Sequence, residues 1–146
     1  MQHYRKGSHT VFDLKYHIVW ITKYRKPVMK GDVAVRVRDL IREISRSMDV
    51  EIVRGHVSRD HVHLFVSIPP RISISNYVKA VKGKSSRKLL SEYRRLSKTF
   101  WGRHIWARGY FAASAGNVTD EVVAEYIRLQ QEAESTHDDD FTIDDA

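Results

Sequence analysis

The hydrophobic residues of this chain recur with two periods, one typical of strands and one of helices, and the order of these segments most constrains the fold. Strand-like segments are expected at residues 11–22, 50–57, 61–68 and 107–115. Helices are expected from Asp32 to Met48, from a cap at Ser73 or Ser75 to about Leu90, and after a cap at Thr119. Residues 96–106 follow neither period and are expected to be irregular.

The order of these segments is strand, helix, strand, strand, helix, strand and a final helix, which is the ferredoxin-like split βαβ order plus one helix. The sequence therefore predicts an α+β fold with a four-stranded antiparallel sheet, helices on one face and an extra C-terminal helix. The other face of such a sheet is left for a ligand, a partner subunit or DNA. The 146 residues suffice for one domain, which we place at residues 1–134, followed by an acidic and flexible tail at 135–146.

The charge of the chain is divided unevenly. The formal net charge is +7, with 25 Lys and Arg against 18 Asp and Glu. Seven of the acidic residues lie after residue 131, where Lys and Arg are absent, so residues 1–131 carry 25 basic and 11 acidic side chains. A body this basic attracts polyanions, most commonly nucleic acid. A solvated basic surface that serves only solubility is the alternative.

Composition excludes several classes of protein. The chain has no cysteine, which removes disulfides and thiolate metal sites. No apolar run approaches the roughly 20 residues of a membrane span, and the first residues lack the apolar core of a secretory signal. We therefore expect a cytoplasmic protein that does not enter a membrane.

The strand expected at residues 61–68 carries two histidines on one face. Its alternation puts four aliphatic residues on the core face: Val62, Leu64, Val66 and Ile68. His61 and His63 then project side by side from the uncovered face, where both imidazoles can reach one cation. A pair with this spacing also arises by chance, so two unrelated surface histidines remain an open interpretation.

The last expected helix offers two further polar groups. Tyr126 and Gln130 are four residues apart and therefore lie on one helical face. Tyr126 also fits the apolar stripe of the helix, so a core aromatic is its alternative role. Gln130 breaks that stripe, and its amide oxygen is a ligand that hard cations accept.

Several segments resemble one known family. His61-Val62-His63 resembles the HUH motif, and YIRLQ at residues 126–130 resembles the nucleophile helix of the single-tyrosine HUH transposases (TnpA type) of the smallest bacterial insertion sequences. YHIVWITKYRKPV at 16–28 resembles the first strand of that family, DHVHLFVSIPP at 60–70 its histidine strand, and WARGYFAASAG at 106–116 the strand before its final helix. The resemblance extends over nearly everything before the acidic tail.

The resemblance implies a reaction and its participants. It implies that His61, His63 and Gln130 bind Mg²⁺ or Mn²⁺ and that Tyr126 attacks a phosphate of single-stranded DNA, leaving a 5′-phosphotyrosine and a free 3′-hydroxyl. Two imidazoles alone would favour zinc, so the choice of Mg²⁺ rests on the resemblance and on the amide oxygen. The family recognises imperfect hairpins at the ends of its element, and the resemblance also implies a homodimer whose active sites are shared between subunits.

Basic and aromatic residues are the candidates for DNA contacts. Those we single out are Lys23, Tyr24, Arg25, Lys79, Lys82, Lys84, Arg87 and Lys88. Tyr24 or Trp101 is the candidate for stacking on a base, and a solvated basic face is the alternative for the charged residues.

Three other functions stay open at this point. A host-domesticated relative that acts on palindromic repeats, or a small nickase of the same HUH class, would keep the chemistry. A ferredoxin-like nucleic-acid-binding module without catalysis would use the basic surface and leave Tyr126 in the core. A histidine-ligated zinc hydrolase lacks an obvious third ligand and a general base, for which Asp60 is the only near candidate.

Overall fold

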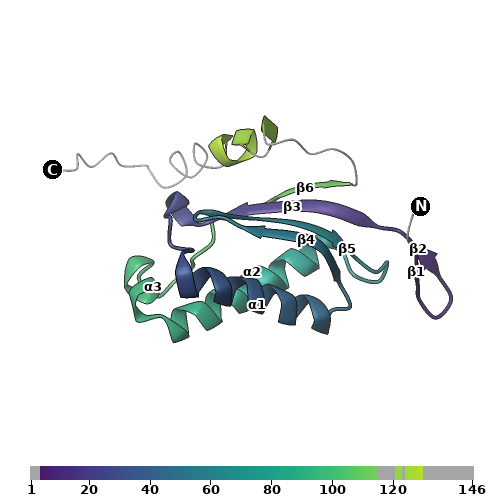
Figure 1. The fold of residues 1–146 in the computed structure, drawn as a ribbon, viewed down its shortest axis with the longest axis horizontal. Coiled ribbons are helices and arrows are strands. Elements are labelled where there is room, and N and C mark those ends of the chain that lie inside the picture. The colour runs from purple at the N-terminus through teal and green to yellow at the C-terminus, as the bar shows by residue number, and fades with distance from the viewer. Residues whose placement is uncertain (1–3, 115–120, 123, 130–146) are drawn as a thin grey trace.

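The structure, a computed structural model, describes residues 4–114, 121–122 and 124–129. Its centre is a four-stranded sheet (Figure 1) with the order β4-β5-β3-β6, in which every neighbouring pair is antiparallel. The strands are β3 (Lys15–Ile21), β4 (Glu51–Val57), β5 (His61–Ser67) and β6 (Phe111–Ser114). The predicted α+β, ferredoxin-like arrangement with a four-stranded antiparallel sheet is confirmed.

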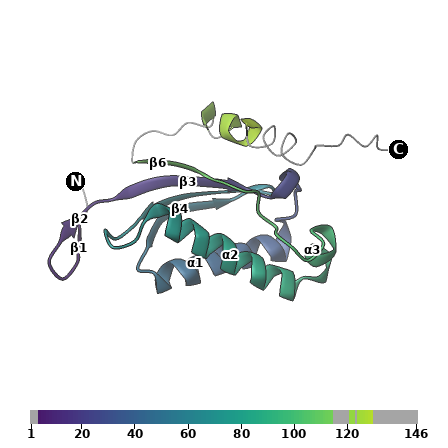
Figure 2. The same cartoon turned by 180° about the vertical axis from the view of Figure 1, so that it is seen from behind.

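Two long helices cover one face of this sheet. α1 (Gly31–Ser47) and α2 (Ile74–Glu92) lie side by side beneath it in both views (Figures 1 and 2). The Ser73 hydroxyl accepts the backbone N–H of Asn76 at 3.1 Å and so caps α2, as the sequence predicts. Between the helices the Ser45 and Tyr77 hydroxyls hydrogen-bond at 2.7 Å, and burial raises the pKa of Tyr77 to about 12. Each of these two buried hydroxyls therefore has a hydrogen-bond partner inside the main core.

The alternation predicted for β5 is confirmed. Val62, Leu64 and Val66 are buried against the helices, whereas His61 and His63 are half-buried on the other face. That other face is partly covered, because residues 124–129 are helical and Ile127 packs against β3 (Figure 1). The extra C-terminal helix therefore lies on the face that carries the histidines.

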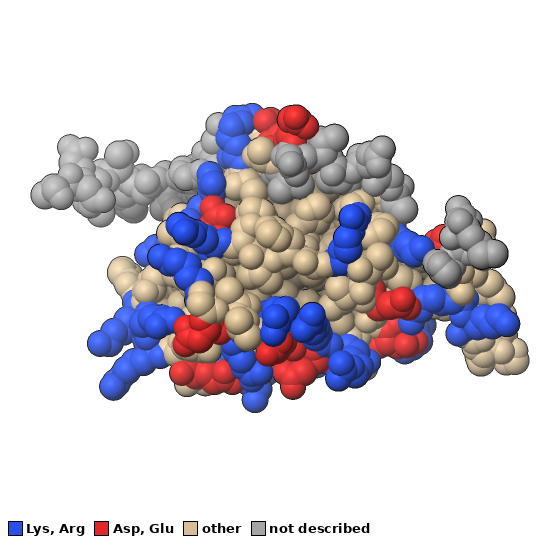
Figure 3. Space-filling model, in the orientation of Figure 1, with Lys and Arg blue, Asp and Glu red and all other residues tan. Residues whose placement is uncertain are grey.

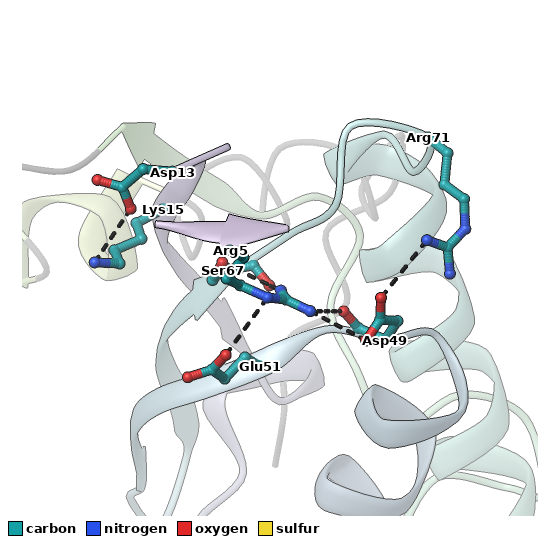
Figure 4. Close-up of polar contacts among 7 residues, drawn as sticks. All are labelled: Arg5, Asp13, Lys15, Asp49, Glu51, Ser67 and Arg71. Atoms are coloured by element: carbon teal, nitrogen blue, oxygen red, sulfur yellow. Dashed lines mark hydrogen bonds and ion pairs between the residues drawn. The ribbon is translucent and has the colours of Figure 1, made fainter. Parts of the chain in front are cut away.

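The region before β3 differs from the prediction. Residues 11–22 do not form one strand: β1 (Arg5–Lys6) and β2 (Val11–Phe12) pair as a small hairpin, and β3 begins only at Lys15. The Arg5 guanidinium connects this hairpin to β5 and to the turn after α1 (Figure 4). It donates hydrogen bonds to the Ser67 carbonyl at 2.9 Å and to the Asp49 carbonyl at 2.8 Å. These partners lie far from Arg5 in sequence, so periodicity gives no sign of the hairpin.

Two further segments differ in extent. Residues 94–99 form the short helix α3 (Arg94–Thr99) with Leu96 buried, and this helix overlaps the segment 96–106 that was expected to be irregular. β6 is shorter than the predicted residues 107–115, because the backbone leaves the sheet before Phe111 and Gly109 has a φ of 88°. The Lys82 ammonium donates to the carbonyls of Ala107 and Gly109 at 2.7 and 2.8 Å, so a side chain of α2 satisfies these two carbonyls.

Two predictions fall partly or wholly beyond what the structure describes. Residues 135–146, the expected acidic tail, and Thr119, the expected helix cap, lie outside the described residues. Among the helices of the described part of the chain, none has the length and apolar character that crossing a membrane requires.

Candidate active site

Sheet pairing places both histidines beside buried residues of β3. In the register of β3 with β5, His63 lies opposite Val19 and His61 opposite Ile21. Val19 and Ile21 are fully buried on the face away from α1 and α2, in a small cluster with Ala107 and Ile127. The histidines are therefore neighbours of the hydrophobic contact between the sheet and the C-terminal helix.

His61 is oriented by a carboxylate. Its Nδ1 lies 2.9 Å from Oδ1 of Asp60, whose Oδ2 accepts a hydrogen bond from Nε of Arg25 at 3.1 Å. Partial burial opposes the ionisation of Asp60, but the hydrogen bonds from His61 and Arg25 hold its pKa below the usual value. An ionised Asp60 fixes the ring so that Nε2 is the nitrogen that can face a cation, as in many metal-binding histidines.

His63 is held by a second histidine. Its Nε2 lies 3.2 Å from Nδ1 of His17, whose ring is stacked on Phe65 with centroids 4.4 Å apart. Partial burial, followed by the proximity of His17, His61 and His56, lowers the pKa of His63. The imidazole is therefore neutral at pH 7, which is the state that binds a metal.

Sequence reasoning missed His17 and His56 as neighbours of this site. His56 lies opposite His63 in the pairing of β4 with β5, and His17 reaches it from β3. In the alternation of β3, His17 falls on the same face as Val19 and Ile21, away from α1 and α2. The register that brings it to His63 follows from long-range strand pairing, which the pattern of one strand does not contain.

Tyr126 lies on the same face of the sheet as the two histidines. Its ring packs against Phe111, with centroids 5.8 Å apart, and against the cluster that contains Val19 and Ile21. The hydroxyl oxygen of Tyr126 is buried. The side chain thus has the packed position of a core aromatic, on the face where the sequence predicts chemistry.

Gln130 lies outside the described residues. Within the described residues, His, Asp and Glu side chains form no group of three or more that could hold a metal. The described part of the chain therefore contains the two histidines that the sequence predicts as ligands, and the predicted third ligand falls beyond it.

The predicted DNA-contacting residues separate into two groups. Lys23, Tyr24 and Arg25 form the 3₁₀ turn η1 (Lys23–Arg25) directly after β3, and the ion pair of Arg25 with Asp60 connects this turn to His61. The others are on α2: Lys79, Lys82, Lys84, Arg87 and Lys88. The structure does not bring this second group to the histidine face, because α2 lies beneath the sheet (Figures 1 and 2). On the side of the molecule that carries α1, basic and acidic side chains are interspersed along the lower surface (Figure 3).

The sequence as a whole matches one family of enzymes. Residues 10–130 match the family described as "Transposase IS200 like". The chain belongs to this family. An IS200-like transposase cleaves and rejoins DNA, so the family supports a DNA-transposing enzyme.

Individual relatives agree with the assignment. The IS200-like transposase described here is 35% identical over 130 residues to the ISDra2 transposase TnpA of Deinococcus radiodurans, a match over 89% of this chain and 93% of that protein. It is 33% identical over 125 residues to the transposase for insertion sequence element IS200 of Salmonella typhimurium, over 86% of this chain and 82% of that protein.

Two solved structures are similar to this transposase. One is a crystal structure of a putative transposase from Deinococcus radiodurans, with a TM-score of 0.79 and 34% identity over 86% of this chain and 97% of that chain. The other is a REP-associated tyrosine transposase bound to a REP hairpin, with a TM-score of 0.54 over 94% of this chain and 74% of that chain. At 14% identity the second shows a shared fold only.

Proposed function

We propose that this transposase cuts and rejoins single-stranded DNA at the ends of an insertion sequence, with Tyr126 as the nucleophile. The observation that carries the proposal is the common location of three side chains. His61 and His63 lie opposite Ile21 and Val19 of β3, and Tyr126 packs against the cluster that contains those two residues. All three side chains therefore lie on one face of the sheet, and we place the scissile phosphate on that face.

The donor set of this face fits a divalent cation. His61 presents Nε2 because its Nδ1 is hydrogen-bonded to Asp60, and the lowered pKa of His63 keeps its ring neutral. Gln130 is the proposed third ligand, one helical turn after Tyr126. Bound Mg²⁺ or Mn²⁺ would supply charge stabilisation at a non-bridging oxygen of the scissile phosphate.

The covalent step balances without a nucleotide cofactor. The Tyr126 oxygen forms a bond to phosphorus, the bond from phosphorus to the 3′ oxygen breaks, and the tyrosine proton ends on the released 3′-hydroxyl. The product is a 5′-phosphotyrosine. Attack of a 3′-hydroxyl on that linkage reverses the step, so one reaction serves for both cutting and joining.

The DNA and the assembly complete the proposal. We propose that the substrate is a single strand folded into imperfect hairpins at the element ends, in keeping with the REP hairpin bound to one structural relative. We further propose a homodimer in which Tyr126 of one subunit completes the histidine site of the other, acting in the cytoplasm. A domesticated nickase that acts on palindromic repeats would use the same residues, and inverted repeats flanking the gene distinguish the mobile element.

Replacement of either histidine tests the metal site. His61→Ala and His63→Ala should each slow cleavage of the DNA that flanks the gene by about a hundredfold or more, because transition-state stabilisation by the cation is lost. Hairpin binding in a gel-shift assay should stay within a few-fold, since phosphate contacts dominate affinity. His9→Ala, an exposed histidine of the N-terminal hairpin, is the control. Chelation of divalent metal should stop cleavage by the wild-type protein. Cleavage retained by both histidine variants would refute the metal site.

A further inference from the structure

A hollow with aromatic and basic walls lies where η1 faces the end of α3. Figures 1 and 2 place α3 and the turn after β3 at the same end of the molecule. The hollow has a volume of about 230 Å³, and its walls include Tyr24, Trp101, Lys23, Lys26 and Arg103. No Asp or Glu is among the described residues that line it. Its charge therefore suits an anionic partner.

Trp101 occupies a backbone position that usually belongs to glycine. α3 ends with the N–H of Gly102 bonded to the Ser97 carbonyl at 2.6 Å and the N–H of Trp101 bonded to the Lys98 carbonyl at 3.3 Å. In this helix-ending motif the residue after the cap is left-handed, and Trp101 has a φ of 56°. The side chain is also 82% exposed. The indole therefore contributes little to the fold and stands on a backbone that disfavours it.

Tyr24 also lines the hollow and resembles Trp101 in its backbone and exposure. Its φ of 58° is left-handed and its side chain is 47% exposed. The backbone on either side is fixed, since the N–H of Lys23 donates to the Ile105 carbonyl at 2.8 Å and the N–H of Arg25 donates to the Thr22 carbonyl at 3.0 Å. Two exposed aromatic residues on hydrogen-bonded backbone thus line the hollow together with lysine and arginine side chains. Such a combination stacks bases and attracts phosphates.

The hollow is joined to the histidine site through Asp60. The Thr22 N–H donates to the Asp60 carbonyl at 2.9 Å, and the carboxylate of Asp60 bridges Arg25 and His61. A strand that presents a phosphate to His61 therefore passes near η1. The volume is below the roughly 300–1,000 Å³ of pockets for drug-sized ligands, so it suits one ring system and excludes a duplex.

We propose that this hollow binds one unstacked base of the single-stranded DNA, held between Tyr24 and Trp101, with Lys23, Lys26 and Arg103 contacting the adjoining phosphates. The inference rests on the proposed function, which identifies the ligand as single-stranded DNA. It adds to that function a site that distinguishes single-stranded from duplex DNA. A paired base is already stacked within its helix and cannot enter.

Tryptophan fluorescence reports this contact directly. Of the three tryptophans, Trp20 and Trp106 are 0% and 5% exposed, so Trp101 is the one that a ligand can reach. Addition of an oligothymidylate of about 15 nucleotides should quench the emission of the full chain. Trp101→Phe should remove the quenching and retain most of the affinity, because a stacking ring remains. Unquenched wild-type emission at saturating oligonucleotide would overturn the proposal.

The variant Trp101→Gly tests whether the indole contributes to DNA binding without contributing to stability. Glycine accepts the left-handed backbone, so the thermal midpoint should stay the same or rise, while affinity for the oligothymidylate should fall about tenfold through loss of a stacking contact. Affinity for a duplex of equal length, which rests on phosphate contacts, should not change. Tyr4→Ala removes an exposed aromatic near the N-terminal hairpin at the opposite end and should leave both affinities unchanged (Figure 1).

The affinity measurements test the base site independently of the catalytic proposal. Wild-type affinity of Trp101→Gly for the oligothymidylate, or an equal loss for single strand and duplex, overturns the base site whether or not DNA is cleaved. A loss of affinity for the single strand alone supports the base site, even if the wild type forms no covalent adduct with DNA. Absence of the adduct would count only against Tyr126 as the nucleophile.

Discussion

His63 shows how far a single residue could be understood from the sequence. Its place on the uncovered face follows from the alternation of β5, since Val62 and Leu64 on either side had to be buried. Its contact with His17 depends on the register of β3 with β5, which is fixed by packing across the whole sheet. The position of the two histidines on one face was therefore predictable, whereas the contact of His63 with His17 was not.

The stability of the metal-free protein should depend on pH through His63. Partial burial and the neighbouring histidines lower its pKa in the folded state, so the unfolded chain binds a proton at higher pH than the folded chain. The free energy of unfolding should therefore fall as the pH drops through about 6.5, the ordinary histidine pKa. His63→Gln should flatten this dependence in urea unfolding between about pH 5 and 7 in the presence of a chelator. Parallel curves for the two proteins would show that His63 does not contribute.

At the scale of elements, long periodic segments were predictable and short ones were not. α1 and α2 were expected within a few residues of their ends, because each has an apolar stripe and α2 has a serine cap. α3 has six residues and a single buried apolar side chain, Leu96, too few for a period to show. β6 was expected to be longer because Ala107 to Tyr110 look strand-like, but the carbonyls there are satisfied by Lys82 of α2.

Lys82 should accordingly matter more for stability than for DNA binding. Lys82→Met removes a charged donor from the carbonyls of Ala107 and Gly109, and the free energy of unfolding should fall by about 1–3 kcal/mol. Lys84→Met, two residues along α2 and exposed, is the matched control and should change stability by less than about 0.5 kcal/mol. Chemical unfolding measures both. Equal effects of the two substitutions would mean that the Lys82 hydrogen bonds do not support the strand region.

At the scale of the whole molecule, the proposed exchange of tyrosines between subunits can be tested by mixing variants. Tyr126→Phe retains the histidines, and the double variant His61→Ala, His63→Ala retains the tyrosine, so each homodimer is inactive. A heterodimer formed by unfolding and refolding the mixture would contain one complete site if sites are shared, and cleavage should partly return. Subunit exchange has to be demonstrated with tagged chains. Once it is, a mixture as inactive as its components would show that each subunit uses its own Tyr126.

The central claim is that Tyr126 becomes bonded to DNA, and a denaturing gel with strand-labelled DNA tests it most directly. With the single strand flanking the gene and Mg²⁺ or Mn²⁺, the wild type should form an adduct that carries label from the 3′ side of the cut, because the 5′ phosphate is the end bonded to protein. Tyr126→Phe keeps the ring and its packing against Phe111, so it should fold and bind DNA but form no adduct. An adduct formed by Tyr126→Phe, or a wild-type adduct that carries only label from the 5′ side, would contradict the account.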